Sequence, residues 1–330
     1  MNNASFLFTE KGEYLPKIAK SLFDGKKVNP KLDFNFDING YSPEFIDNIG
    51  KISISGMQEK FGAKVEQGKI RLMTPGEQSL FILKPVPNDK VLRDRHEIPA
   101  NEHLTMQIGS LVYGIKTAPN ALCYASNGGL VYITKRFDIQ AEGKKIRMED
   151  LATILGKSEL TGGKHFKYSG SYEDVAKAIK TFVAASMIDL ERFFNLIVFN
   201  YIYGNGDAHL KNFSLICSEL DYSLSPAYDL LNTALHIDDD DFALSEGLSP
   251  NIEKSDNYDR TGHPCRVDFE LFGKLIGLRE ARIMKILNKY SVVPEEARNM
   301  INQSLLSGKA KRNYLRIVNE RTARFNRKEK

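Results

Sequence analysis

Three polar side chains in the second half of the sequence have the types and spacing of a site that handles a divalent metal ion. Asp207 lies in the segment 204–214, Gly-Asn-Gly-Asp-Ala-His-Leu-Lys-Asn-Phe-Ser, and Asn212 follows it by five positions. A second acid, Asp229, closes the stretch Leu-Ser-Pro-Ala-Tyr-Asp. Carboxylate and amide oxygens are the hard ligands that Mg²⁺ prefers, with waters and phosphates completing its shell. The three side chains could therefore face one cleft and hold a metal-bound phosphate.

The spacing of these residues is that of a known catalytic loop. In protein kinases an Asp accepts the proton of the substrate hydroxyl, an Asn five positions later binds magnesium, and a further Asp is the principal metal ligand. Asp207, Asn212 and Asp229 follow that order. The alternative is that Asp207 caps a turn and Asp229 caps the next helix, because Asp often does both. For the ordered set of three we favour the catalytic interpretation.

The elements around these residues should position them. The apolar run 193–203 predicts a long buried helix, and the glycines that follow end it because glycine takes left-handed backbone angles without steric penalty. The segments 213–216 and 222–224 predict two short strands around a turn. Such a hairpin would bring Asn212 and Asp229 side by side at its open end.

A second group of candidate residues lies in the first half of the chain. Short apolar runs broken by turn signals in 52–85 predict a small antiparallel sheet, and Lys84 closes its last strand. Kinases use a strand Lys to contact nucleotide phosphates and to pair with a helix Glu. Glu102, near the start of a predicted helix, could be that partner. The alternatives are that Lys84 snorkels to solvent and that Glu102 interacts only with the helix dipole.

Two further segments could contact a nucleotide. Ser53 and Ser55 precede a glycine in a loop that could cover phosphates with N–H groups and hydroxyls, although a plain hairpin explains it equally well. The segment 121–138 predicts a hairpin whose second strand would lead into a hinge. Phe137 at its end could flank an adenine base or simply belong to the core.

The second half of the chain is predicted to be mostly helical. The polar, glycine-rich segment 157–171 is expected to be mobile and could carry substrate contacts, and the acids 238–241 predict a solvated loop rather than a metal site. We therefore expect an α+β, two-lobe protein-kinase-like fold with a β-rich N-lobe at 1–137 and a helical C-lobe at 138–330. The helices are predicted over 148–156, 172–185, 189–203, 269–276, 280–290 and 294–306, with a basic, solvated last helix in 309–330.

The composition limits the class of protein. Of 330 residues, 42% are hydrophobic and 27% charged, as in a soluble globular protein, and the net charge of +4 is too small to indicate nucleic-acid binding by itself. Three widely spaced Cys form neither a disulfide framework nor a zinc pattern, which suggests the reducing cytoplasm. No apolar run is long enough for a membrane helix.

The sequence resembles the HipA-like serine/threonine kinases, the toxins of bacterial toxin–antitoxin modules. The resemblance implies an enzyme that uses ATP and Mg²⁺, with Asp207 as catalytic base and Asn212 and Asp229 as metal ligands. It also implies that Lys84 contacts ATP phosphates and that His209 lies by the nucleotide. The segments that carry the resemblance are Ser-Ile-Ser-Gly-Met-Gln-Glu-Lys at 53–60, Ile-Leu-Lys-Pro at 82–85, Arg-Phe-Asp at 136–138, Glu-Asp-Leu at 149–151, 206–214, and Pro-Ala-Tyr-Asp at 226–229.

The same resemblance implies a form of regulation and a set of partners. Ser53 and Ser55 would be autophosphorylated, and the added negative charge would repel ATP from its phosphate site. Because only about fifty residues precede the serine loop, the chain resembles the short HipT type. That type implies a small HipS-like antitoxin protein, a HipB-like DNA-binding protein that supplies the only link to DNA, and an aminoacyl-tRNA synthetase as the protein substrate.

Two other classes of function remain open from the sequence. The chain could be a catalytically silent subunit that holds an antitoxin–DNA complex, and titration with ATP and magnesium would discriminate it from a kinase. It could also be a small-molecule kinase, since kinases acting on aminoglycosides share an Asp and an Asn at this offset. Labelled ATP in a whole lysate would show whether a protein or a small molecule receives the phosphate.

Overall fold

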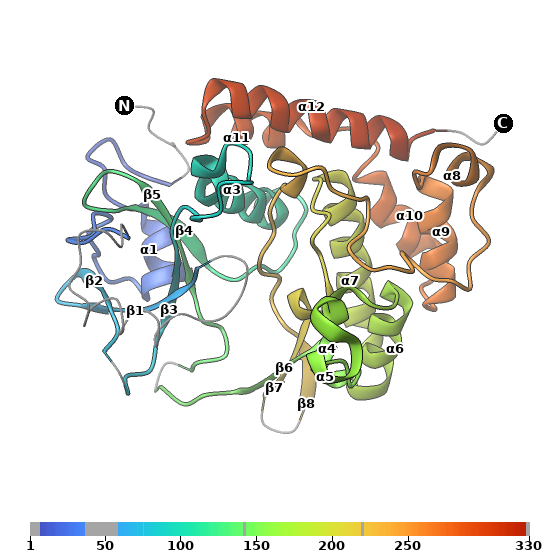
Figure 1. The fold of residues 1–330 in the computed structure, drawn as a ribbon, viewed down its shortest axis with the longest axis horizontal. Helices are drawn as coiled ribbons and strands as arrows, with labels where there is room; N and C mark the ends of the chain where they lie inside the picture. The colour runs from blue at the N-terminus through green and yellow to red at the C-terminus, as the bar shows by residue number, and fades with distance from the viewer. Residues whose placement is uncertain (1–6, 37–58, 75, 141–142, 219–220, 328–330) are drawn as a thin grey trace. The chain divides into compact units, whose positions relative to one another are not determined.

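The computed structural model describes residues 7–36, 59–74, 76–140, 143–218 and 221–327. The chain divides into two compact units (Figure 1). The segment 42–48, for which Ser42 as cap and Pro43 in the first turn predict a short helix, lies outside the described residues, as does the loop with Ser53 and Ser55. Unit 1 comprises Met1–Gln107, Ala118–Lys145 and Asn299–Lys311, and unit 2 comprises Ile108–Thr117, Ile146–Arg298 and Arg312–Lys330.

Unit 1 is built on a five-stranded antiparallel sheet in the order β2-β1-β3-β5-β4. Gln67 and Gly68 join the first two strands with φ values of 49° and 75°, the pair of positive φ angles that a two-residue hairpin turn requires. The predicted sheet and the second hairpin are both confirmed. The strands are β1 (Phe61–Glu66), β2 (Lys69–Leu72), β3 (Phe81–Lys84), β4 (Asn120–Tyr124) and β5 (Leu130–Lys135).

Two helices accompany this sheet. α1 (Pro16–Phe23) begins with a proline, whose fixed φ suits the first helical turn, and it buries Ile18, Leu22 and Phe23. α3 (Ile98–Leu111) follows the short 3₁₀ helix η2 (Arg95–Glu97) and is the helix predicted to carry Glu102. Its first part belongs to unit 1, where Glu102 is almost fully buried.

Unit 2 is organised around α7 (Ser186–Ile202), the predicted buried helix. Every residue from Phe193 to Ile202 is buried, so the helix forms the centre of an apolar core rather than one wall of it. No helix among the described residues combines the length and apolarity needed to cross a bilayer. The other helices of the second half are α4 (Leu151–Ile154), α5 (Glu159–Gly162), η3 (Gly163–Tyr168), α6 (Tyr172–Phe182), η4 (Leu210–Asn212), η5 (Thr233–Leu235), α8 (Asp256–Thr261), α9 (Arg266–Leu275), α10 (Glu280–Asn288), α11 (Glu295–Gln303) and α12 (Gly308–Phe325).

A small second sheet in unit 2 corrects one prediction. β6 (Arg147–Asp150), β7 (Ser214–Ser218) and β8 (Asp221–Leu224) pair in that order, whereas a helix was predicted to begin at Met148. Backbone pairing with β7 overrides the local helical pattern there. The helix α4 starts only at Leu151, after the Asp150 side chain accepts a hydrogen bond from the Thr153 N–H.

Candidate active site

The loop that carries Asp207 begins at the end of α7 and needs two glycines. Gly204 has φ +67° and ends the helix. Gly206 needs no unusual φ, but a Cβ there would lie closer than 3.0 Å to the Asp239 carboxyl group and the Asp240 carbonyl oxygen. A backbone oxygen cannot move aside as a flexible side chain can, so only glycine fits at position 206.

Hydroxyl groups from two other segments anchor this loop. The Gly206 N–H donates to Thr233 Oγ1 at 2.8 Å, and Thr233 Oγ1 also hydrogen-bonds with the Asp239 carboxylate. Tyr172, fully buried at the start of α6, donates its hydroxyl to the Ala208 carbonyl oxygen at 3.0 Å. The backbone on both sides of Asp207 is therefore fixed by bonds to residues distant in sequence.

The hairpin formed by β7 and β8 places Asn212 beside Asp229, as the sequence predicted. The Asn212 Nδ2 group donates to Asp229 Oδ2 at 3.4 Å. At the base of the hairpin the Ser225 N–H donates to the Ser214 carbonyl at 2.9 Å, which continues the ladder. Tyr228 closes the same end, since its hydroxyl donates to the Lys211 carbonyl at 2.9 Å and contacts Ser214 Oγ at 2.6 Å.

Two features of this pair fit a magnesium ion. Asn212 Oδ1 is buried and has no hydrogen-bond partner among the described residues, which leaves a buried acceptor for a cation. Asp229 has φ 55°, a conformation that costs a non-glycine residue energy and is concentrated at functional sites. In the described part of the chain no three His, Cys, Asp or Glu side chains cluster as metal ligands. Magnesium sites that use one or two carboxylates and substrate phosphates do not need such a cluster.

The electrostatic surroundings of Asp207 favour a base. Burial raises the pKa of its carboxyl group above the ordinary value, and the nearby charges of Asp239 and Asp229 raise it further. A hydrogen bond from Tyr168 and the charge of Lys167 act in the opposite direction. The side chain remains 36% exposed, so a substrate can reach it. A carboxylate of raised pKa accepts a proton more readily, as a general base requires.

His209, which the resemblance places near the nucleotide, lies next to Asp207. Its Nε2 is 3.9 Å from Asp207 Oδ2, and its ring meets the ring of Tyr168 edge to face with 5.3 Å between the centroids. The imidazole is buried, at 8% exposure. His209 is thus part of the immediate surroundings of the carboxylate.

In unit 1 the predicted partners Lys84 and Glu102 form a buried ion pair. Lys84 Nζ lies 2.5 Å from Glu102 Oε1, and the two side chains are only 4% and 2% exposed. Lys84 is opposite Tyr132 in β5, and its ammonium group lies 5.3 Å from the centre of that ring. The alternative that Lys84 snorkels to solvent is therefore wrong. Phe137 lies just beyond the end of β5 and is half-buried.

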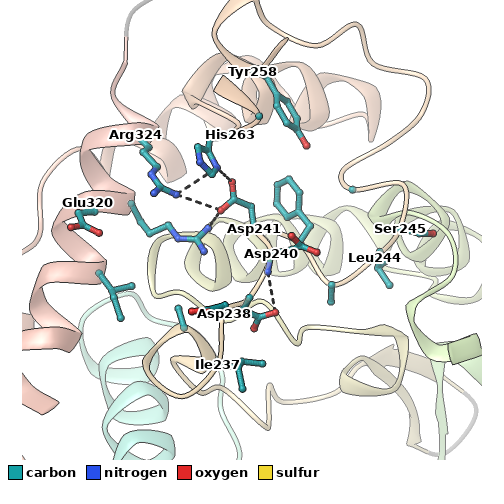
Figure 2. A pocket seen from close by; sticks show the side chains of 18 of the residues that line it. Ile237, Asp238, Asp240, Asp241, Leu244, Ser245, Tyr258, His263, Glu320 and Arg324 are labelled. Atoms are coloured by element: carbon teal, nitrogen blue, oxygen red, sulfur yellow. Dashed lines mark hydrogen bonds and ion pairs between the residues drawn. The ribbon is translucent and has the colours of Figure 1, made fainter. Parts of the chain in front are cut away.

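A pocket of about 670 Å³ lies within unit 2 (Figure 2). The contacts among the residues that line it show that two predictions were wrong. Asp241 accepts a hydrogen bond from His263 at 2.8 Å and pairs with Arg321 and, at 3.9 Å, with Arg324. Arg321 is only 6% exposed. The acids 238–241 are thus not simply a solvated loop, and α12 is not simply a solvated basic helix. Residues far apart in sequence pair here, which the charge pattern alone did not indicate.

Besides Tyr172, the sequence analysis did not identify Tyr168, Thr233 or Asp239 as residues around Asp207. Tyr168 donates its hydroxyl to Asp207 Oδ1 at 2.9 Å, and Thr233 and Asp239 support the glycine that precedes Asp207. Tyr168 belongs to the segment 157–171, which was expected to be mobile but forms α5 and η3. Only the pairing of distant segments reveals these contacts, since no local spacing links them to the loop.

Comparison with known proteins places this site in a family. The family model for the HipA-like C-terminal domain matches residues 52–297. The Haemophilus influenzae protein named "Putative kinase" is 26% identical over 86% of this chain and 84% of its own length. Two Sinorhizobium fredii proteins with the same kind of name, Y4mE and Y4dM, are 27% and 29% identical, and the alignments span 44% and 48% of their lengths.

Solved structures share the fold. HipA of the Shewanella oneidensis MR-1 toxin–antitoxin system, in complex with HipB and its operator DNA, matches with a TM-score of 0.63 and 17% identity over 88% of this chain and 67% of that one. The Helicobacter pylori proinflammatory kinase CtkA matches with a TM-score of 0.50 and 17% identity over 80% of this chain and 93% of that one.

These likenesses define the class of protein: an α+β fold of the HipA and CtkA kind, with a curled β-sheet lobe and a helical lobe, as predicted. The family model covers well over half of the chain. The chain belongs to the HipA-like C-terminal domain family.

Proposed function

We propose that this chain is a cytoplasmic serine/threonine protein kinase that uses ATP and Mg²⁺. The observation that carries the proposal is the pairing of Asn212 with Asp229, which leaves Asn212 Oδ1 as a buried acceptor. The charge of Asp229 in turn raises the pKa of Asp207. Kinases need these groups in this order. Membership of a family whose relatives include proteins named as kinases supports the same reading.

In this proposal Asp207, the two metal ligands and the residues that anchor the loop have separate roles. Asp207 accepts the proton of the substrate serine as its oxygen attacks the γ-phosphorus of ATP, and the bond from that phosphorus to the ADP oxygen breaks. Asn212 and Asp229 would hold the metal through Oδ1 and the carboxylate. A bound magnesium ion would neutralise charge on the phosphates. Thr233 and Tyr172 keep the loop backbone in place during transfer.

Four residues are proposed to contact or orient the nucleotide. Lys84 contacts its phosphates, and Glu102 holds the Lys84 ammonium group in position through the 2.5 Å bond. Phe137, half-buried after β5, flanks the adenine. His209 lies by the nucleotide, next to Asp207.

Intact mass after incubation with ATP and magnesium tests the proposal directly. The wild-type chain should gain about 80 Da per phosphate and should phosphorylate protein in a lysate, whereas Asp207→Gln should do neither. Asp259→Gln, which removes an exposed acid on α8, is the matched control and should behave as wild type. Phosphate transfer by Asp207→Gln would refute the assignment. Failure of the wild type to bind ATP would favour a silent binding subunit instead.

Ser53 and Ser55 are the proposed autophosphorylation sites. Phosphate there adds negative charge that would repel the phosphates of ATP. Wild type should carry the extra mass, and Ser53→Ala/Ser55→Ala should lose it while it still phosphorylates its target. Retention of the added mass by that double variant would place self-modification elsewhere.

The finer identity of the system is also a proposal. The two serines of the Ser-x-Ser loop suggest the HipT type, with a HipS-like small protein and a HipB-like DNA-binding protein as partners. The HipA neighbour was solved with HipB and operator DNA, which supports a partner of that kind. The proposed substrate is a translation protein, in particular an aminoacyl-tRNA synthetase. Labelling of a lysate with ATP should identify it, and labelling of small molecules alone would exclude it.

A further inference from the structure

Tyr168 contacts the proposed catalytic base directly. The Tyr168 hydroxyl donates a hydrogen bond to Asp207 Oδ1 at 2.9 Å. An ionised carboxylate only accepts hydrogen bonds, so the phenol must be the donor. Tyr168 is 39 residues before Asp207 in sequence, and the bond is partly buried.

The position of Tyr168 is fixed by its own surroundings. Its carbonyl oxygen accepts the Ser245 N–H at 2.8 Å, and the Gly170 carbonyl accepts the Glu246 N–H at 3.0 Å. The Gly170 N–H in turn donates to Ser245 Oγ at 3.2 Å. These bonds attach the end of η3 to the segment 244–247. The phenol is therefore presented to Asp207 by paired backbone rather than by a free loop.

Two further side chains contact the Tyr168 ring. Its ring meets the His209 ring at an interplanar angle of 75°. The Lys167 ammonium group lies 4.8 Å from the centre of the Tyr168 ring, a distance at which a cation is attracted to the aromatic face. Tyr168 thus reaches Asp207 as part of a small packed group.

The hydrogen bond from Tyr168 sets the orientation of the Asp207 carboxylate. The χ2 torsion of Asp is broad, so an isolated carboxylate turns easily. Donation from Tyr168 to Oδ1 restrains rotation of the carboxylate. The other oxygen, Oδ2, then lies on the side of His209, whose Nε2 is 3.9 Å from it. A substrate hydroxyl then meets an oxygen of defined orientation, which lowers the entropic cost of reaching the reactive geometry.

Resting on the kinase function proposed above, we infer that Tyr168 is a positioning residue for Asp207: its hydroxyl orients the carboxylate so that Oδ2 is the oxygen that takes the substrate proton. The residue contributes no atom to the transfer itself. It gives the segment 157–171 a defined task, which is to present the phenol from η3.

Steady-state kinetics of Tyr168→Phe test this inference, because Phe keeps the ring and removes only the hydroxyl. We expect kcat to fall about tenfold or more, as for loss of a hydrogen bond to a charged group, with KM for ATP unchanged. Tyr222→Phe, a half-buried tyrosine on β8, is the matched control and should keep wild-type kinetics. Rates are expressed per folded molecule, with thermal unfolding measured for each variant. An unchanged kcat, or a change in KM alone, would overturn the inference.

The pH dependence of kcat/KM gives a second readout that a purely structural residue would not move. The Tyr168 hydroxyl lowers the pKa of Asp207, so the acidic limb should move to higher pH in Tyr168→Phe. A limb that stays in place would overturn the inference. An inactive Asp207→Gln beside a wild-type-like Tyr168→Phe would reject only the positioning role, whereas an active Asp207→Gln would reject the kinase assignment. Among the described residues, the charged or titratable groups that act on Asp207 or contact it include Tyr168, Lys167, His209, Asp239 and Asp229.

Discussion

The buried pair of Lys84 and Glu102 allows a quantitative test. Nζ and Oε1 are 2.5 Å apart, and the side chains are 4% and 2% exposed. Removal of one partner leaves an uncompensated charge where water hardly reaches. Such truncations cost about 3–5 kcal/mol, whereas replacement of both partners by apolar residues of similar size is often neutral or stabilising. We therefore expect Lys84→Met and Glu102→Leu each to be strongly destabilising, and the double variant to recover most of the loss.

The expected shift is large enough for thermal unfolding by calorimetry. For a unit of this size 1 kcal/mol corresponds to about 2–4 °C in Tm, so each single variant should lose roughly 6–20 °C and the double variant only a few degrees. Lys309→Met is a matched control in the same unit, because the Lys309–Asp94 pair is 67% and 28% exposed and should contribute about 1 kcal/mol or less.

The same single and double variants separate the effect of Lys84 on stability from its effect on ATP binding. If Lys84 contacts ATP phosphates, the double variant should be folded but should bind ATP far more weakly than wild type. Single variants as stable as the double variant would show that the two charges are not coupled, and the electrostatic account of this pair would be refuted. Wild-type ATP affinity in the stable double variant would instead refute the role of Lys84 alone.

Four further predictions concern unit 2. Gly206→Ala should destabilise the protein by about 1–3 kcal/mol in thermal melts, and adding Asp239→Ala should not rescue it, because the backbone oxygen of Asp240 also collides with the new methyl group. Asp239→Asn should shift the acidic limb of kcat/KM to lower pH, since the charge it removes raises the pKa of Asp207; an upward shift would contradict this. Asn212→Leu should raise the magnesium concentration needed for half-maximal activity at least about tenfold in a metal titration, and an unchanged requirement would exclude Oδ1 as a ligand. Asp207→Asn should raise Tm at neutral pH while it abolishes activity. The pKa of Asp207 is raised on folding, so the ionised form costs stability above its ordinary pKa of about 4, and the advantage of Asn should fade as pH drops toward that value.

The parts of the fold that the sequence predicted are those governed by local pattern. Short apolar runs broken by turn signals predicted the strands of unit 1, and the apolar run before Gly204 predicted α7. The approach of Asn212 to Asp229 was predictable because a hairpin brings its own two ends together. The Lys84–Glu102 pair was predictable because Lys84 closes a predicted strand and Glu102 lies near the start of a predicted helix, the order in which kinases carry such a pair.

The parts that failed depend on pairing between distant segments. Met148 lies in a strand because β7 pairs with it, and nothing within the local sequence indicates that partner. Asp241 pairs with Arg321, eighty positions later, so neither the acidic run nor the basic tail could be interpreted alone. Tyr168 likewise has no local signal, because its hydroxyl bonds to a residue 39 positions later in the chain.

The surroundings of Asp207 argue that the site was shaped for chemistry rather than stability. Burial and two neighbouring carboxylates raise the pKa of Asp207, so its ionised form costs stability at neutral pH. Burial raises the pKa of Asp239 as well, although Thr233 opposes it. A loop selected for stability alone would replace one of these acids with an amide. The hydroxyls of Tyr168, Tyr172 and Thr233 instead hold the acidic loop in place, which is the expected arrangement where a carboxylate must stay basic and still keep one orientation.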